Sequence, residues 1–515
     1  METTAADANR VPAAGPPGSA AGEKGLKKDA LGFVSNLVIG VASTAPGYSL
    51  AATLGFIVGV AGIGLQSPAV LLVSFIPMLL IAAAYYYMNR ADPDCGTTFS
   101  WATRAMGPYF GWLGGWAIVV ADVLVMANLA QIAGLYSFLL VGWESAADST
   151  VAVTVVGVVW IAVMTAICVY GIELSARTQV GLLGAEVITL ALFAGVALYK
   201  VYAGDAGPGA IDPSLSWLNP FEIDSFSALV SGVLLGVFIY WGWDSTVTVN
   251  EESTNSSETP GRAALVSTVI LLLIYVVVAI AAQAYGGPEE LVKNADDVLS
   301  ALGESVFGSP LDKILIIAVL TSAAASTQTT ILPTARTSLS MARAGAMPES
   351  LGRVHSRFLT PHVSTILMGS LSIVWYVVLT LISENILFDS LAALGLMIAF
   401  YYGLTGFACA IYYRRELTRN VETFVLIGVA PVLGGVILLA IFIKSCIDLW
   451  DPANSESGDA WFGIGPPFII GIGFLLLGVV LMLYWRIGHR AFFERRPEVA
   501  DPALVARAPV TGGEA

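Results

Sequence analysis

Charged residues and the residue types that build reactive centres are scarce in this sequence. Asp, Glu, Lys and Arg make up 12% of the chain, about half of their share in soluble domains. The three histidines form no cluster, Cys95, Cys168, Cys409 and Cys446 show no metal-type spacing, and no Walker-type phosphate loop occurs. These absences argue against a metal centre, a cysteine–histidine nucleophile and an ATP-driven motor. We therefore predict a protein without enzyme activity and without a cofactor.

Long apolar runs are what the sequence has in abundance. Hydrophobic residues make up 56% of the chain, and they gather in runs of about 20 residues or more, the length that crosses a bilayer. Twelve such runs cover residues 31–61, 68–88, 108–141, 151–171, 177–202, 226–249, 263–285, 311–342, 363–383, 388–413, 423–447 and 465–485. We predict an all-α integral membrane protein with twelve transmembrane helices. Its partner is then the lipid bilayer, and no nucleic acid is expected.

Basic residues are distributed unevenly between the loops. If the chain starts inside, the outer loops carry only Lys200, Lys293, Lys313 and Lys444, and nearly all other Lys and Arg residues flank inner ends. Because an excess of Lys and Arg marks cytoplasmic loops, we predict cytoplasmic termini in a bacterial-type plasma membrane. The outer loops are acidic, which explains much of the net charge of −14.

Residues 1–29 and 490–515 lie outside the apolar runs. They are rich in Ala, Gly, Pro and small polar residues, a composition that buries too little apolar surface to fold. We predict that both are disordered cytoplasmic tails. The first has no apolar segment next to a positive one, so it is not a cleaved signal peptide.

Two apolar spans are interrupted at the same relative place. The first span breaks between Ser43 and Gly47, and the sixth breaks between Trp241 and Asp244. Proline removes a backbone donor and glycine leaves helical geometry cheaply, while free backbone groups at membrane depth need a watery cavity or protein partners. Matched broken helices in two halves of a chain point to a substrate site at the midplane of a secondary transporter.

The breaks divide the chain into two inverted repeats of five spans each. These cover about residues 30–202 and 226–415, so residues 30–415 form a transport core, and residues 416–489 add spans eleven and twelve. Between spans seven and eight, residues 289–306 read as a short external helix with one apolar face. It is either a surface helix resting on the bundle or part of an outer gate.

Several motifs resemble those of the amino acid–polyamine–organocation permeases. They are Gly242-Trp243-Asp244, Glu251-Glu252 and Thr259-Pro260-Gly261-Arg262 around span six, and Arg336 followed by the stretch from Met341 to Pro348 after span eight. The resemblance implies a LeuT-type fold and transport by alternating access. The first break departs from the family, because the stretch from Ser43 to Ser49 replaces the usual Gly-Ser-Gly pattern.

A substrate zwitterion needs donors for its carboxylate and acceptors for its ammonium group. The amides of the half-helix that starts near Gly47 would hold the carboxylate, and carbonyls from Phe238 to Trp241 would hold the ammonium. The resemblance implies that Phe238 closes over the substrate, although each aromatic side chain can equally serve packing. The candidate substrate-binding residues are Ser43, Thr44, Ala45, Gly47, Phe238, Tyr240, Trp241 and Gly242.

An acidic residue within an apolar span is a functional candidate by default, and we single out Glu186, Asp244 and Asp122. Glu186 lies where some proton-coupled members of the resembled family have a lysine, and we expect it to load and release a proton. Asp244 matches a family acid tied to pH response and inner gating. For Asp122, a structural hydrogen bond to a neighbouring span is the alternative that we favour.

The driving ion is open to two readings. Oxygens of Ala42, Ala45, Ser326 and Thr327 would form a weak sodium site, but the hydroxyls of span eight serve equally well for close helix packing. We favour protons. The overall prediction is a secondary active amino acid transporter, either a symporter or an antiporter, with a small-molecule substrate and a proton as partners.

Other functions remain open at this stage. They are a polyamine or amine transporter, an amino acid exchanger, and a receptor that does not transport. The sequence does not fix the particular substrate or the oligomeric state.

Overall fold

The computed structural model describes residues 22–500, apart from residues 296, 383–384 and 456. Within these ranges the chain is helical, and its extended backbone pairs only in two isolated bridges, Leu31 with Ser253 and Trp461 with Ile464. This confirms the predicted all-α class. Residues 1–21 and 501–515, which hold most of the two predicted tails, lie outside the described residues.

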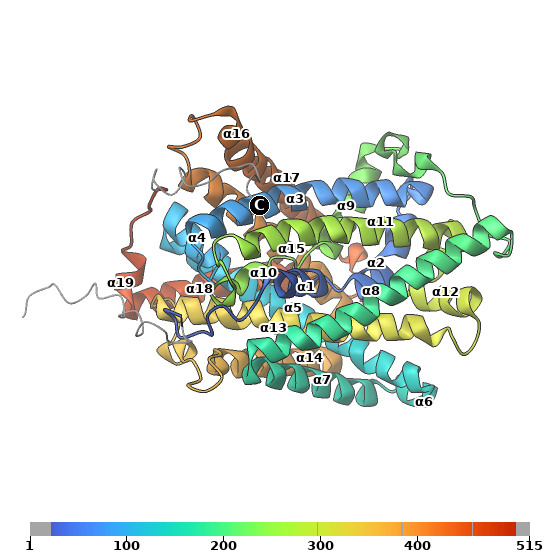
Figure 1. Cartoon of the computed structure of the whole chain (residues 1–515), viewed down its shortest axis with the longest axis horizontal. Helices are drawn as coiled ribbons and strands as arrows, with labels where there is room; N and C mark the ends of the chain where they lie inside the picture. The colour runs from blue at the N-terminus through green and yellow to red at the C-terminus, as the bar shows by residue number, and fades with distance from the viewer. Residues whose placement is uncertain (1–21, 296, 383–384, 456, 501–515) are drawn as a thin grey trace, which may run out of the picture.

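Long helices form the body of the molecule (Figure 1). They are α3 (Ser67–Ala91), α5 (Pro108–Val141), α7 (Thr150–Tyr170), α8 (Ile172–Ala203), α11 (Thr259–Lys293), α13 (Lys313–Arg343), α14 (His362–Ile382), α15 (Asn385–Tyr412), α17 (Ala430–Trp450) and α18 (Pro466–Gly488). The shorter helices are α1 (Phe33–Ser43), α2 (Pro46–Gly59), α4 (Thr98–Met106), α6 (Glu144–Ala147), α9 (Phe226–Ile239), α10 (Ser245–Thr248), α12 (Val298–Phe307), α16 (Val421–Thr423) and α19 (Arg490–Phe493).

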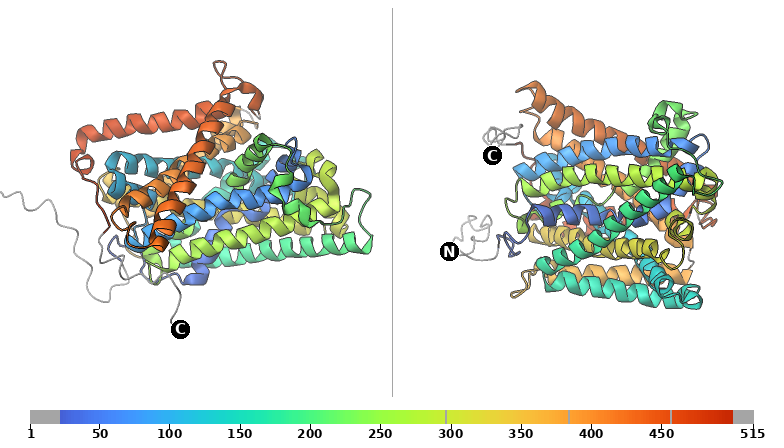
Figure 2. Two further views of the ribbon diagram at one scale, coloured as in Figure 1. Left: turned by 90° about the horizontal axis from the view of Figure 1, so that it is seen from above. Right: turned by 45° about the vertical axis from the view of Figure 1, so that its right-hand side comes forward.

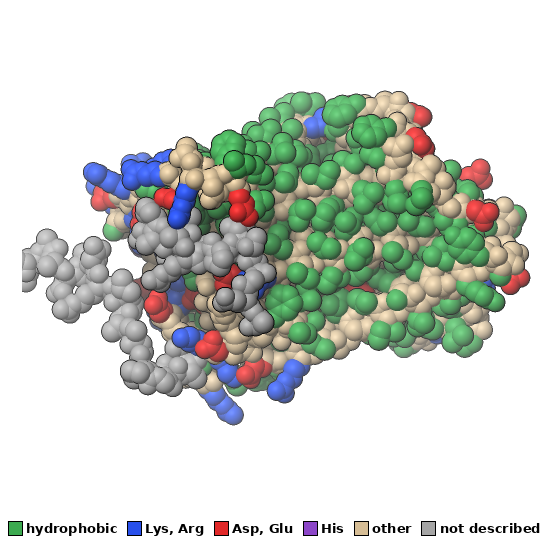
Figure 3. Space-filling model, turned by 45° about the horizontal axis from the view of Figure 1, so that its top comes forward, with side chains coloured by type: hydrophobic (Ala, Val, Ile, Leu, Met, Phe, Trp, Pro, Cys, Tyr) green, Lys and Arg blue, Asp and Glu red, His purple; other side chains and the backbone are tan. Residues whose placement is uncertain are grey.

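Eleven helical stretches in the described part are long and apolar enough to cross a membrane. They correspond to the predicted spans except the sixth, which is divided between the short α9 and α10. The count of twelve therefore stays a prediction. Hydrophobic side chains cover the broad middle of the face shown in Figure 3, as a bilayer requires.

The first broken helix turns at Ala45. This residue has left-handed backbone angles (φ 46°, ψ 61°), and α2 begins directly after it at Pro46. Proline suits the first helical position because its missing N–H would have no helical partner there. The predicted start near Gly47 is thus one residue late, and Gly47 lies inside α2. An added Cβ at Gly47 would come within 3.3 Å of Glu186 Oε1, so this glycine permits a close approach and does not make the bend.

The second broken helix turns at Gly242. Its φ of 119° favours glycine, and a Cβ at this position would lie 2.6 Å from the carbonyl oxygen of Ser43. The two breaks are therefore in direct contact. Because α1 packs on α10 and α2 packs on α9, the two broken helices run antiparallel at the centre of the bundle (Figure 1). This is the arrangement that inverted repeats predict.

The helix α13 forms the inner wall beside the breaks. Every residue from Ser322 to Ala342 is buried, and the helix packs on α5, α8 and α1. Its many hydroxyl and small side chains allow this close packing. At the other side of the core, α17 packs on α3 and α15, and α18 packs on α15 and α5, so the last two spans lie at the periphery (Figure 2).

The described ends of the chain are ordered, and the prediction of disorder is wrong for residues 22–29 and 490–500. Phe492 and Phe493 of α19 are buried in a cluster with Phe99 and Trp112, and the amide of Ala500 donates to Tyr412 O. These contacts supply the buried apolar surface that composition alone did not indicate.

Both described ends pack on the end of α13. Arg343 donates to Lys24 O, and Arg495 donates to Ala344 O. We call this side, formed by residues 22–32, α4, the end of α13 and α19, the terminal face. Lys and Arg gather at this end of the molecule, whereas Asp and Glu predominate at the opposite end (Figure 3).

The predicted external helix is shorter than expected. Residues 289–293 continue α11 beyond a kink at Gly287 (φ 72°), and the separate helix α12 begins at Val298. Its apolar face is buried, as predicted, through Val298, Leu299, Leu302 and Val306. It packs on α2, α8, α11 and α13 at the end opposite the terminal face (Figure 1).

Candidate substrate site at the two helix breaks

A glutamate carboxylate binds the first turn of α2. The amide of Gly47 donates to Glu186 Oε1 at 2.7 Å, and the adjacent amide of Tyr48 donates to Ser322 Oγ at 3.1 Å. Glu186 is fully buried, and its second oxygen, Oε2, has no hydrogen-bond partner. A buried carboxylate with an unmatched oxygen is costly as an anion. The side chain predicted to carry a proton therefore lies against the amide predicted to hold substrate.

The other amides at this break also have partners. Thr44 N donates to Val41 O, and Ala45 N donates to Ala42 O. A carboxylate can therefore bind these amides only by displacing a protein acceptor. Of the two side chains involved, Glu186 can lose its negative charge by taking up a proton, whereas the Ser322 hydroxyl carries none.

Hydroxyl groups join the two breaks to α13. Ser43 Oγ and Ser245 Oγ lie 2.7 Å apart, and Ser326 Oγ donates to Ser43 O at 3.0 Å. Thr327 Oγ1 donates to Ala323 O within its own helix. The side-chain oxygens proposed for a sodium ion thus take part in helix contacts in this structure.

Asp244 lies directly after the second break, within reach of two tyrosines of α15. Tyr402 OH donates to Asp244 Oδ1 at 2.8 Å, and Tyr401 OH lies 3.3 Å from Oδ2. Tyr401 OH also accepts from Trp241 Nε1, and Gly242 N points at Tyr402 OH at 3.5 Å. The two tyrosines therefore connect the second break to α15.

Asp122 of α5 is buried and bonded to α13. Thr334 Oγ1 donates to Asp122 Oδ2 at 2.8 Å. This is a hydrogen bond to a neighbouring span, of the kind expected from the sequence. Among the described residues, the hydrogen-bond donors to Asp122, Glu186 and Asp244 are all uncharged groups.

The predicted aromatic residues have different surroundings. Phe238 is partly buried at the last turn of α9, whereas Tyr240 is fully buried and donates to Leu71 O. Two of the carbonyls proposed for an ammonium group already accept bonds, Phe238 O from Trp241 N and Ile239 O from Tyr275 OH. Thr44 Oγ1 donates to Val41 O, so its hydroxyl is also engaged.

Sequence reasoning missed the tyrosines that complete this region. Tyr401, Tyr402, Tyr85 and Tyr275 are buried around the second break, and Tyr85 and Tyr402 pack on the ring of Trp243. Buried tyrosine hydroxyls need partners. The sequence shows Tyr401 and Tyr402 as a pair inside an apolar run. It does not show their contacts with Trp241 and Gly242, which lie 160 positions away.

An ion pair lies between the second break and the terminal face. Arg336 Nε lies 2.5 Å from Glu252 Oε2, and both side chains are at most 2% exposed. The pair joins α13 to the turn of residues 250–252 that follows α10.

Relatives with known descriptions share large parts of this chain. An uncharacterised transporter of Mycobacterium tuberculosis is 29% identical over 301 residues, which are 57% of this chain and 63% of the relative. The low-affinity putrescine importer PlaP of Escherichia coli is 20% identical over 393 residues, 76% of this chain and 82% of PlaP. The branched-chain amino acid permease BcaP of Lactococcus lactis is 24% identical over 405 residues, 75% of this chain and 82% of BcaP.

The chain thus spans less than two thirds of the length of the mycobacterial relative. The sequence profile of the family described as amino acid permease, by contrast, matches residues 28–483, which contain both broken helices, α17 and most of α18. The chain belongs to the amino acid permease family.

Proposed function

We propose that this protein is a secondary active transporter that carries an amino acid by alternating access and is driven by protons. The family of this chain and its similarity to an amino acid permease, BcaP, and a putrescine importer, PlaP, support a small substrate with an amino group. The single observation that carries the proton-coupled mechanism is the contact of Glu186 with Gly47 N. Midplane breaks with ionisable side chains are the usual substrate and ion sites of such carriers.

Coupling follows from competition for the Gly47 amide. An ionised Glu186 occupies that donor and repels a substrate carboxylate that approaches it. When Glu186 takes up a proton, the repulsion ends and the substrate carboxylate replaces it at the amide, next to the positive end of α2. Proton and substrate therefore bind together, which is the requirement for symport.

In this proposal the terminal face is cytoplasmic. The gathering of Lys and Arg at that end supports this orientation. The Arg336–Glu252 pair and the Asp244–tyrosine contacts then lie on the inner side of the substrate, where they have to rearrange before release.

Proteoliposomes provide the test. Counterflow with a panel of labelled amino acids identifies the substrate, and its uptake is then measured with an inward proton gradient and with Na⁺ replaced by choline. We expect stimulation by the proton gradient and no effect of choline. An absolute requirement for Na⁺ would overturn proton coupling and favour the oxygens of Ala42, Ala45, Ser326 and Thr327.

An amine substrate is the second candidate. Asp122, Asp244 and Glu186 are buried, and their hydrogen-bond partners among the described residues are uncharged. Such carboxylates suit ammonium groups at both ends of a diamine, and PlaP is described as a putrescine importer. Including putrescine in the same counterflow panel distinguishes the candidates, because exchange of putrescine without exchange of any amino acid would favour the amine carrier.

A further inference from the structure

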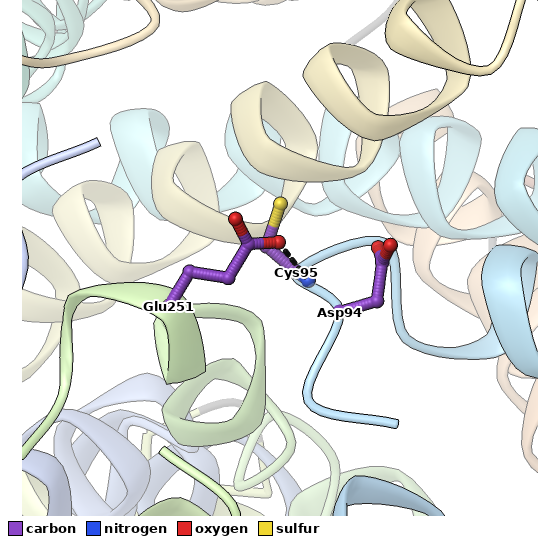
Figure 4. A group of neighbouring side chains, drawn as sticks. All are labelled: Asp94, Cys95 and Glu251. Carbon is purple, nitrogen blue, oxygen red and sulfur yellow. Dashed lines mark hydrogen bonds between the residues drawn. The ribbon is translucent and has the colours of Figure 1, made fainter. Parts of the chain in front are cut away.

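The segment before α1 places a lysine in a partly buried group of acids. Lys24 Nζ lies 2.8 Å from Asp94 Oδ2, 2.7 Å from Glu251 Oε1 and 3.3 Å from Ser340 Oγ. Figure 4 shows the receiving group, in which Glu251 and Asp94 flank Cys95 and the amide of Cys95 donates to Glu251 Oε1 at 2.9 Å. The Lys24 side chain is only 17% exposed.

Asp94, Cys95 and Glu251 have the ligand types of a cation site, and the ammonium group of Lys24 binds to the two carboxylates. One ligand atom each from Asp94, Cys95 and Glu251 lies within 4.8 Å of the others. Burial by itself lowers the pKa of Lys24, but the charges of Asp94 and Glu251 outweigh it and hold that pKa well above its usual value. The ammonium group is therefore charged at neutral pH and is held by charge-assisted bonds.

The partners of Lys24 come from three separate parts of the chain. Asp94 lies in the loop between α3 and α4, Glu251 lies in the turn after α10, and Ser340 lies in the last turns of α13. Lys24 itself precedes α1. One side chain thus connects the ends of both broken helices to α13 and to the α3–α4 loop.

Further contacts fasten the same segment. Leu26 is 1% exposed and packs in a cluster with Cys95 and Leu339. The amides of Ala30 and Leu31 both donate to Glu252 O, and the carboxylate of Glu252 binds Arg336. The Lys24 group therefore lies directly outside the Arg336–Glu252 pair and forms a second ionic layer.

Both α1 and α10 pack on α13 next to the breaks, so a path that opens from the breaks to the terminal face requires these contacts to separate. These are the elements that Lys24 joins. We propose that residues 22–31 form a latch, in which Lys24 holds the terminal face closed and has to leave the Asp94–Glu251 group before that face opens. This role adds a gating element that is separate from the substrate site.

Accessibility of a buried cysteine tests the latch without substrate or gradient, so the result does not depend on the proposed transport activity. The reporter is Ser245→Cys at the two breaks, in a background with Cys168→Ser, Cys409→Ser and Cys446→Ser. Cys95 is kept because it belongs to the Lys24 group, and the same background without Ser245→Cys measures any labelling of Cys95. Modification of the reporter by an impermeant maleimide is timed from each side of sealed vesicles. Lys24→Met keeps the length of the side chain and removes its charge.

We expect Lys24→Met to speed modification from the terminal-face side by about tenfold, the effect of a tenfold shift in the open population. Lys28→Met is the matched control, because Lys28 is exposed in the same segment, and it should label at the parental rate. Lys24→Arg, which keeps the charge, should also label slowly.

Parental labelling of the reporter in Lys24→Met would overturn the latch, since a purely local contact would not control access to the breaks. If Lys24→Met does not fold, Glu251→Gln weakens the same group and carries the same expectation. Failure of both variants to fold would likewise overturn the proposal, because the group would then be a structural tether.

Discussion

Glu186 Oε1 accepts a 2.7 Å hydrogen bond from the amide of Gly47, across 139 positions of sequence. This contact joins α8 to the first turn of α2 in the middle of the bundle. It links the protonation state of one buried carboxyl group to a backbone donor that a substrate carboxylate needs.

Glu186→Gln mimics the protonated side chain in size and charge. We expect this variant to retain substrate counterflow and to lose stimulation of uptake by an inward proton gradient. Both assays use the same proteoliposomes, so counterflow serves as the internal control for folding and binding. Uptake by Glu186→Gln that still follows the proton gradient would assign coupling to another residue.

Gly47→Val should abolish substrate binding. A Cβ at this position would lie 3.3 Å from Glu186 Oε1 and 3.4 Å from Ala318 O, and the branched valine side chain needs more room than that. Gly195→Val in α8 is the control, because a Cβ there meets nothing within 4 Å. Scintillation proximity binding measures both variants, and normal binding by Gly47→Val would place the site elsewhere.

Tyr402→Phe should destabilise the structure around the second break. The change removes the donor to Asp244 Oδ1 and leaves a buried carboxylate less satisfied, at a cost of about 1–3 kcal/mol. We expect a lower thermal unfolding temperature and an altered pH profile of transport, and Asp244→Asn should alter that profile as well. Tyr484→Phe, at a tyrosine that is 71% exposed, should match the parent in both measurements.

Arg336→Met should destabilise the protein strongly. It leaves Glu252 buried without its cation, and breaking such a pair costs about 3–5 kcal/mol. The double variant Arg336→Met/Glu252→Gln should recover part of the loss, because the uncompensated charge is gone. Unfolding of all variants in detergent measures the coupling, and equal stability of the single and double variants would contradict it.

Orientation is tested with two exposed serines. Ser214 lies in the segment between α8 and α9. Ser356 lies between α13 and α14, close in sequence to Val354, which packs on the cluster that contains Leu26 of the terminal face. In intact cells, an impermeant maleimide should label Ser214→Cys and should not label Ser356→Cys. Labelling of Ser356→Cys from outside would reverse the proposed orientation.

Local features of this fold follow from the sequence. The breaks at Pro46 and Gly242 and the apolar face of α12 result from backbone chemistry and short-range patterns. The partners in the long-range contacts do not follow from the sequence. The partner of Gly47 N lies 139 positions away, and the partners of Asp244 lie at a similar separation. Composition also failed at residues 490–500, where Phe492 and Phe493 find buried positions on α4 and α5 that only the folded bundle provides.

The left-handed angles of Ala45 have an energetic consequence for the transport cycle. The left-handed conformation costs a residue with a Cβ about 1–2 kcal/mol, so the backbone at the first break is strained. If the break straightens when α1 moves, this energy returns and lowers the barrier for leaving the observed state. Ala45→Gly would remove this strain. The equilibrium between the two end states of the carrier would then shift toward the conformation described above.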